Sequence, residues 1–167
     1  EKLKDSPVVL SAHFDHLGTG RPDAHKRDEG KIHNGADDNA SGVAILLEVA
    51  KSMAKTARPK RTIIFVAFTG EEAGLIGSRY FVSQINKYFS GYVIADVNLD
   101  TDGSLFDKSL LVLNGNSAKE WKFVFMGTDY TTGVKSEVVE QELDASDQVA
   151  FIEQGIPAVQ LFTGALL

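Results

Sequence analysis

Apolar strand-like segments alternate with amphipathic segments along this chain, and this alternation is the feature that most constrains the fold. Val8–Leu10 and Ile63–Phe68 are continuous apolar runs, which are typical of strands covered on both faces of a sheet. Between them, over 40–56, apolar residues recur at spacings of three and four, which predicts a helix with one apolar stripe. The other expected elements are strands over 92–99, 110–113 and 157–162, helices over 77–84, 117–127 and 147–154, and an ambiguous segment over 134–139. This order favours an α/β sandwich with a largely parallel central sheet.

The composition fits one domain and argues against several kinds of partner. The 167 residues suit a single sizeable core, and the apolar share of 43% and the charged share of 24% are those of a globular protein. The net charge is −6 without a stripe of lysine and arginine, which argues against nucleic acid as a partner. No apolar run reaches the length of a membrane span, and the lack of cysteine excludes disulfides and thiolate ligands. The oligomeric state stays open.

Acidic and histidine residues follow three of the expected strands. His13 and Asp15 end the first strand, Glu71 and Glu72 follow the second, and Asp100 follows the third. Because parallel strands present their carboxyl ends at one edge of the sheet, we expect these side chains to converge there. Carboxylates in such a group repel one another unless cations lie among them, and mixed imidazole and carboxylate ligands suit zinc, cobalt or manganese better than calcium. Asp15 is placed to accept the second ring N–H of His13 and so to orient that ring.

The segment Asn34–Gly42 adds a fourth acidic position at the start of the first helix. By itself, the pair Asp37-Asp38 fits an ordinary loop in which Asn39 or Ser41 caps the helix. Beside the strand-end residues, however, we interpret Asp37 as a further ligand of a cation.

The charges of these residues match two divalent ions. Asp37, Glu72 and Asp100 supply three negative charges, and a hydroxide that bridges two metals supplies a fourth. Glu71 is then left to act as general base, because neighbouring side chains point in different directions and Glu72 is occupied.

Five motifs that carry these residues occur in order between about 7 and 164. They are His13-Phe14-Asp15-His16, Asn34–Gly42, Phe68–Glu72, Asn98-Leu99-Asp100, and Ser146-Asp147 with Gly155–Ala158. Together they resemble the motifs of the co-catalytic di-zinc aminopeptidases of the bacterial leucyl-aminopeptidase type, which are related to glutamate carboxypeptidase. The resemblance implies a three-layer, zinc-exopeptidase-like α/β sandwich around a largely parallel mixed sheet.

The resemblance also implies a role for each matching residue. The metal ligands it implies are His13 and Asp100 on one zinc ion, Glu72 on the other, and Asp37 as the bridge between them. Glu71 is the general base, and Asp15 orients a ligand. The peptide bond between Asp37 and Asp38 is expected to be cis.

The chain departs from the family pattern in one respect. The family has a further histidine ligand soon after a turn like Phe162-Thr163-Gly164, whereas all four histidines here precede Asp37. We therefore expect residues 1–167 to be one truncated metallopeptidase domain that holds the second metal weakly and has little or no activity. His16, His25 and His33 could replace the ligand, but their loop is expected to be a solvated rim.

The leading hypothesis is a metal-dependent exopeptidase, specifically an aminopeptidase acting on peptides with a free N-terminus. The bridging hydroxide would attack the carbonyl, and Glu71 would carry the proton to the leaving amine. The alternatives are a carboxypeptidase or amidohydrolase on the same scaffold, a glutaminyl-cyclase-like enzyme, and a non-catalytic binding domain, against which the retained carboxylates count. Because the family is commonly secreted, a secreted or periplasmic location is expected.

Overall fold

The apolar runs of the sequence form one mixed sheet in the part of the chain that the structure describes. This computed structural model describes residues 3–20, 30–56, 59–89, 91–142 and 146–164. The strands are β1 (Val8–His13), β2 (Ile63–Phe68), β3 (Ala95–Leu99), β4 (Leu110–Leu113), β5 (Ser136–Val138) and β6 (Ala158–Phe162). The helices are α1 (Gly42–Lys55), α2 (Ile76–Tyr88), α3 (Glu120–Thr132) and α4 (Gln148–Ile152), with short helical turns at Ala36–Ser41 and Gly115–Ser117.

The order of strands in the sheet is β2-β1-β3-β6-β4-β5. The neighbours β2, β1, β3 and β6 pair in parallel, so their carboxyl ends lie at one edge. β4 pairs antiparallel with β6 and parallel with β5, which makes the sheet mixed. The prediction of a largely parallel sheet is confirmed.

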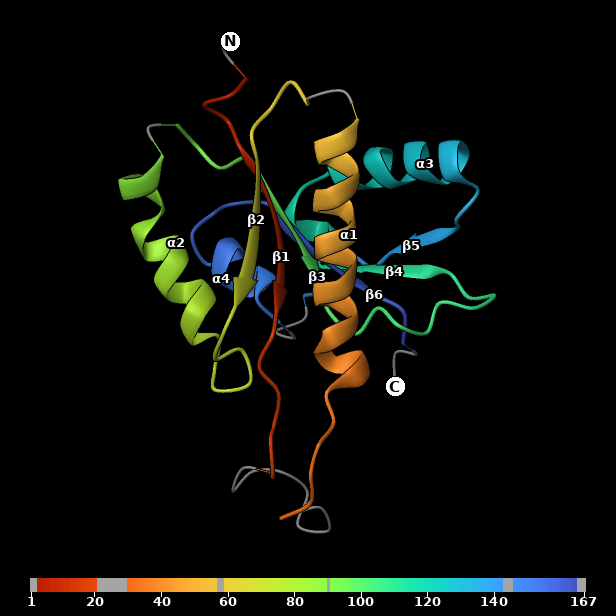
Figure 1. The fold of residues 1–167 in the computed structure, drawn as a ribbon. Helices are drawn as coiled ribbons and strands as arrows, with labels where there is room; N and C mark the ends of the chain where they lie inside the picture. The colour runs from red at the N-terminus through yellow and green to blue at the C-terminus, as the bar shows by residue number, and fades with distance from the viewer. Residues whose placement is uncertain (1–2, 21–29, 57–58, 90, 143–145, 165–167) are drawn as a thin grey trace.

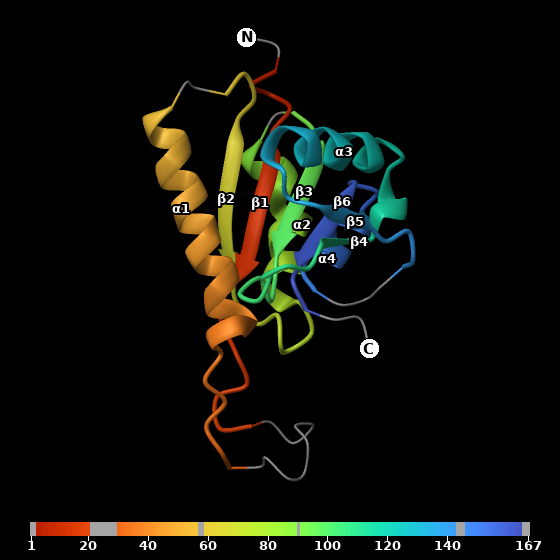
Figure 2. The ribbon, with the colours of Figure 1, turned by 90° about the vertical axis from the view of Figure 1, so that its right-hand side faces the viewer.

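Helices cover both faces of this sheet, as Figures 1 and 2 show: α2 and α4 lie on one face, and α1 and α3 lie on the other. Alternation along β1 explains the two faces, because successive side chains of a strand point in opposite directions. Val9 packs in the cluster beneath α2 and α4, whereas Ala12 packs against Leu46 of α1. The predicted three-layer sandwich is therefore present.

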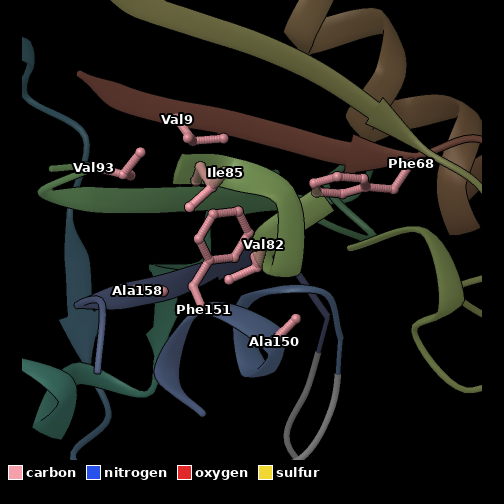
Figure 3. Packing of buried hydrophobic residues seen from close by; sticks show 8 residues of the cluster. All are labelled: Val9, Phe68, Val82, Ile85, Val93, Ala150, Phe151 and Ala158. Atoms are coloured by element: carbon pink, nitrogen blue, oxygen red, sulfur yellow. The ribbon is translucent and has the colours of Figure 1, made fainter. Parts of the chain in front are cut away.

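The largest of these clusters lies between the sheet and the helix pair α2 and α4 (Figure 3). Phe151 of α4 is completely buried at its centre. Its ring centroid lies 6.3 Å from those of both Phe68 and Phe81. This packing fixes α4 directly beneath the carboxyl ends of the parallel strands.

Several bounds of the secondary structure differ from the sequence-based expectation, most clearly at the third strand and over 134–139. The third strand begins at Ala95 rather than at 92, and Tyr92 is largely exposed. The ambiguous segment over 134–139 contains the edge strand β5, which pairs with β4. No helix in the described ranges is both long enough and apolar enough to cross a membrane.

Candidate metal centre

His13 and Asp100 meet at the ends of two neighbouring parallel strands. The register of β1 and β3 pairs Ser11 with Asn98, so that two residues later His13 lies beside Asp100. His13 Nε2 is 3.5 Å from Asp100 Oδ1, and both side chains are buried. Burial lowers the pKa of His13, but the carboxylates of Asp100 and Asp38 outweigh it and raise this pKa to about 11. Burial alone would raise the pKa of Asp100, yet the contact with His13 lowers it overall.

Asp38 lies at the junction of two groups of possible metal ligands. The first group is His13, Asp38 and Asp100, and the second is His16, Asp38 and Glu72. Within each group the ligand atoms lie within 4.8 Å of one another. Asp38 Oδ1 is 3.3 Å from His13 Nε2, and Asp38 Oδ2 is 3.6 Å from His16 Nδ1. One carboxylate therefore faces both groups, which is the arrangement of a bridging ligand.

The structure does not bring Asp37 into this cluster, and Asp38 occupies the place between the two groups that was expected of Asp37. Asp37 Oδ1 accepts a hydrogen bond of 2.7 Å from the backbone N–H of Gly103, and Ser104 Oγ lies 3.4 Å from Asp37 Oδ2. A Cβ on Gly103 would lie 2.6 Å from Asp37 Oδ1, so only glycine allows this approach. The physical reason is that neighbouring side chains diverge: one aspartate faces the strand ends while the other holds the loop after β3.

The backbone around Asp38 is tied to the end of β3 by Asn39. Asn39 Nδ2 donates a 2.8 Å hydrogen bond to Leu99 O, and Asn39 Oδ1 accepts one of 3.0 Å from the N–H of Gly42. The N-cap of α1 is Ser41, whose side chain makes no capping hydrogen bond, while Asn39 accepts the N–H of the first helical residue. The cis peptide bond joins Asp38 to Asn39, one residue later than expected.

Asp15 supports the cluster in a different way from the one expected. The ring nitrogen Nδ1 of His13 lies 3.0 Å from the backbone oxygen of Asp15, whereas the Asp15 carboxylate is 3.8 Å away. The carboxylate instead accepts a 3.2 Å hydrogen bond from the backbone N–H of Glu71. The prediction that the Asp15 side chain orients His13 is therefore wrong in its atoms, because the chain turns after His13 and presents the carbonyl. Asp15 fixes Glu71 through its side chain and His13 through its backbone.

Glu71 and Glu72 both lie half-buried on the loop that follows β2. Burial raises the pKa of Glu71 to about 8, the positive charge of His13 opposes this, and Asp147 and Asp100 add to it. Burial also raises the pKa of Glu72, and the carboxylate of Asp38 adds to this shift. Both pKa shifts come chiefly from burial, and the neighbouring carboxylates add to them.

Asp147, which the family resemblance includes in its last motif, belongs to the surroundings of this cluster. Asp147 precedes α4, but its side chain makes no capping hydrogen bond. Its carboxylate is completely buried, and neither oxygen has a hydrogen-bond partner in the described part of the chain. Burial raises the pKa of Asp147 to about 6. Asp147 therefore does not cap α4, and it adds a buried acid whose charge acts on Glu71.

A network of buried polar side chains links β1 and β3 to Ser146, which lies near Asp100. Ser11 Oγ donates to Asp96 Oδ1 at 2.9 Å, and it also lies 3.1 Å from Asn98 Oδ1. Asn98 Nδ2 donates at 2.9 Å to Ser146 Oγ, and the Ser146 hydroxyl helps to lower the pKa of Asp100. Ser11, Asp96 and Asn98 alternate with apolar residues along their strands. This alternation predicts which face of the sheet each side chain lies on, but it does not predict which residues they contact there.

The histidines of the loop after β1 are not equivalent. His16 Nδ1 lies 2.8 Å from Glu72 Oε1, so this residue belongs to the cluster rather than to a solvated rim. His33 packs with its ring edge-on against His16, at a centroid distance of 6.2 Å. His25 lies outside the described residues. The spacing of three residues between His13 and His16 is the signal that could have pointed to His16.

The donor set and its spacing fit a divalent ion. Zinc binds imidazole nitrogen and carboxylate oxygen at about 2.0–2.2 Å, so two ligands at a tetrahedral angle lie about 3.4 Å apart. The contacts of Asp38 and Asp100 with the two imidazoles measure between 3.3 and 3.6 Å. Asp38 Oδ1 is also buried without a hydrogen bond to any described residue. Such separations are too long for good hydrogen bonds and match atoms arranged around a common ion.

A three-layer α/β sandwich with a histidine–carboxylate cluster at the carboxyl ends of its parallel strands belongs to the class of α/β domains that carry a candidate metal site. Within this class, residues 1–165 match the sequence model of peptidase family M28. The chain therefore belongs to this family.

Two aminopeptidases match most of this chain in sequence but are much longer. The probable leucine aminopeptidase 2 of Aspergillus fumigatus is 36% identical over 145 residues, which are 78% of this chain and 28% of that relative. Aminopeptidase YwaD of Bacillus subtilis is 31% identical over 161 residues, which are 94% of this chain and 32% of that relative. The chain thus spans about a third of the length of these relatives.

Solved structures share the same fold. The zinc aminopeptidase BSAP from Bacillus subtilis superimposes with a TM-score of 0.77 at 26% identity, over 98% of this chain and 38% of that chain. The LapA aminopeptidase of Legionella pneumophila gives a TM-score of 0.79 at 24% identity, over 98% of this chain and 42% of that chain. The likeness to LapA concerns the fold.

Proposed function

We propose that this protein is a zinc-dependent aminopeptidase that uses two divalent ions and removes residues from peptides with a free N-terminus. The observation that carries the proposal is the shared carboxylate of Asp38, which faces two groups of possible ligands at the carboxyl edge of the sheet. Membership of peptidase family M28 supports peptide hydrolysis, and the names of the relatives favour the aminopeptidase reading over a carboxypeptidase.

The residues of the cluster divide into ligands and a proton carrier. His13 and Asp100 would hold one ion, Glu72 would hold the other, and Asp38 would contact both. When bound, such ions supply Lewis acidity, which activates water and polarises the carbonyl of the scissile bond. Two positive ions also relieve the crowding of carboxylates that the pKa shifts report.

Glu71 is the residue best suited to move the proton. It is half-buried beside the ligands, and its backbone is held by the carboxylate of Asp15. Burial raises the pKa of Glu71 to about 8 without bound ions, and nearby cations would lower it, so that the carboxylate could accept a proton. Glu71 would take a proton from the attacking water and deliver it to the nitrogen of the leaving amine.

The test compares leucine p-nitroanilide with its N-acetylated form, using the protein with zinc and after removal of zinc by a chelator. We expect hydrolysis of the free-amine substrate only, complete loss with the chelator, and recovery when zinc is restored. Equal hydrolysis of the N-acetylated substrate, or hydrolysis that survives full removal of metal, would contradict the proposal. Release of the C-terminal residue from a peptide with a blocked N-terminus would instead identify a carboxypeptidase.

A further inference from the structure

We propose that His16 is a direct ligand of the second ion, so that the loop after β1 supplies an imidazole to each half of the metal centre. This inference rests on the proposed function and deepens it, because it concerns the ligands of the same centre. The ligands that the family resemblance implies do not include His16, and the structure points to it independently.

The position of one ring nitrogen carries the proposal. His16 Nδ1 lies 2.8 Å from Glu72 Oε1 and 3.6 Å from Asp38 Oδ2. The three ligand atoms of His16, Asp38 and Glu72 form a group within 4.8 Å, as do those of the group around His13. An ion between them would therefore have one nitrogen and two oxygen donors, which is a donor set that zinc accepts.

The contacts of His16 with the protein leave this nitrogen available. The His16 side chain is only 21% exposed, yet Nδ1 is buried and forms no aligned hydrogen bond within the described ranges. Nδ1 faces Glu72 Oε1 at an ion-pair distance of 2.8 Å, so the ring points into the second group of ligands. A purely structural histidine at this depth would be expected to use both ring nitrogens for hydrogen bonds.

Packing holds the ring in this orientation. Gly35 lies against it so closely that a Cβ at that position would be 3.0 Å from His16 Cβ. On another side the ring of His33 packs edge-on at a centroid distance of 6.2 Å and an angle of 60°. Gly35 also has a positive φ of 66°, which glycine adopts without strain. This backbone conformation lets the chain that leads to Asp38 pass close to His16.

The charges favour an ion at the second group as well. Glu72 and Asp38 bring two carboxylates to a half-buried place. A neutral imidazole satisfies the third position of a zinc site without adding charge, and the carboxylates offset the charge of the ion. With His13 serving the first group, the same short loop supplies one nitrogen ligand to each ion.

The test measures metal binding and nitrogen coordination rather than activity. Zinc stoichiometry and affinity are determined by competition with a chelator for the wild type, for His16→Gln and for the control Glu48→Gln, at an exposed position of α1 outside both groups. We expect two ions in the wild type and in Glu48→Gln. In His16→Gln we expect one ion to bind as before and the other to bind at least about 100-fold more weakly. Losing a ligand lowers metal affinity more than losing a residue that only hydrogen-bonds to a ligand.

Nitrogen NMR of the zinc-loaded wild type, labelled with ¹⁵N-histidine, gives a second readout that does not depend on a variant. We expect the Nδ1 resonance of His16, assigned by its absence in His16→Gln, to show the shift of a metal-bound nitrogen. A metal-free shift with unchanged stoichiometry in His16→Gln would overturn the proposal and make His16 a positioning residue for Glu72. If the wild type binds no zinc at all, the proposed function itself fails, so the two failures are distinguishable.

Discussion

Asp38→Asn removes the negative charge that both ligand groups share, and Asp37→Asn is its matched control. The two residues are neighbours of identical chemistry, yet Asp38 lies 3.3 Å from His13 Nε2 while Asp37 accepts its 2.7 Å hydrogen bond from Gly103 N. The pair of variants therefore separates a role in metal binding from a role in holding the loop after β3.

The expected magnitudes follow from these contacts. Removing a residue that hydrogen-bonds to a metal ligand lowers metal affinity about 10- to 100-fold. Removing the charged ligand Asp38 itself should therefore lower zinc affinity by at least about 100-fold, or about 2.8 kcal/mol. Asparagine at 37 keeps an oxygen for the N–H of Gly103 but loses the charge. Because charge-assisted hydrogen bonds contribute about 1 kcal/mol more than neutral ones, Asp37→Asn should lower the free energy of unfolding by about 1 kcal/mol.

Two assays distinguish these effects. Competition with a chromophoric chelator measures zinc affinity, and urea denaturation in excess chelator measures the stability of the metal-free protein. We expect Asp38→Asn to lose zinc affinity and Asp37→Asn to bind zinc within about threefold of the wild type. If Asp37→Asn weakens zinc binding as much as Asp38→Asn does, the assignment of the shared ligand to Asp38 is wrong.

Three further predictions concern the proton carrier, a buried acid and the core. Glu71→Gln should lower kcat for leucine p-nitroanilide by about 10²- to 10⁴-fold while zinc affinity stays unchanged, and a loss of zinc instead would make Glu71 a ligand. Burial raises the pKa of Asp96 well above its ordinary value of 3.8, so the folded state binds a proton that the unfolded state releases, and stability falls as pH rises above 3.8. Asp96→Asn keeps an acceptor for Ser11 and should make this fall shallower in denaturation curves between pH 4 and 7, whereas an unchanged slope would refute the raised pKa. Phe151→Ala should lower the free energy of unfolding by about 3–5 kcal/mol, against under about 0.5 kcal/mol for Phe123→Ala, whose side chain is 64% exposed.

The secondary structure and the general place of the site follow from local patterns. The apolar run Ile63–Phe68 matches β2, and β4 has the bounds expected for it, because short apolar runs between turn residues are typical of buried strands. The strand-end residues His13 and Asp100 meet because parallel strands end at the same edge, and this rule needs no knowledge of the strand order. The three residues of β5 carry too little pattern to be recognised without their partner β4.

The sequence could not show which of the neighbours Asp37 and Asp38 faces the cluster. Asp37 and Asp38 have the same side chain and adjoining positions, so propensity and charge cannot tell them apart. The loop after β3 decides between them, because Gly103 and Ser104 come from more than 60 residues away and engage Asp37. The same holds for Asp15, whose carbonyl rather than carboxylate meets His13.

By itself, then, the sequence determined which elements form and that acids and histidines gather at one edge of the sheet, since both depend on the period of apolar residues and on the polarity of parallel strands. Only the tertiary structure decided which atoms face the cluster and that His16 is among them. The physical reason is that the direction of a side chain in a loop depends on packing and hydrogen bonds with residues distant in the chain.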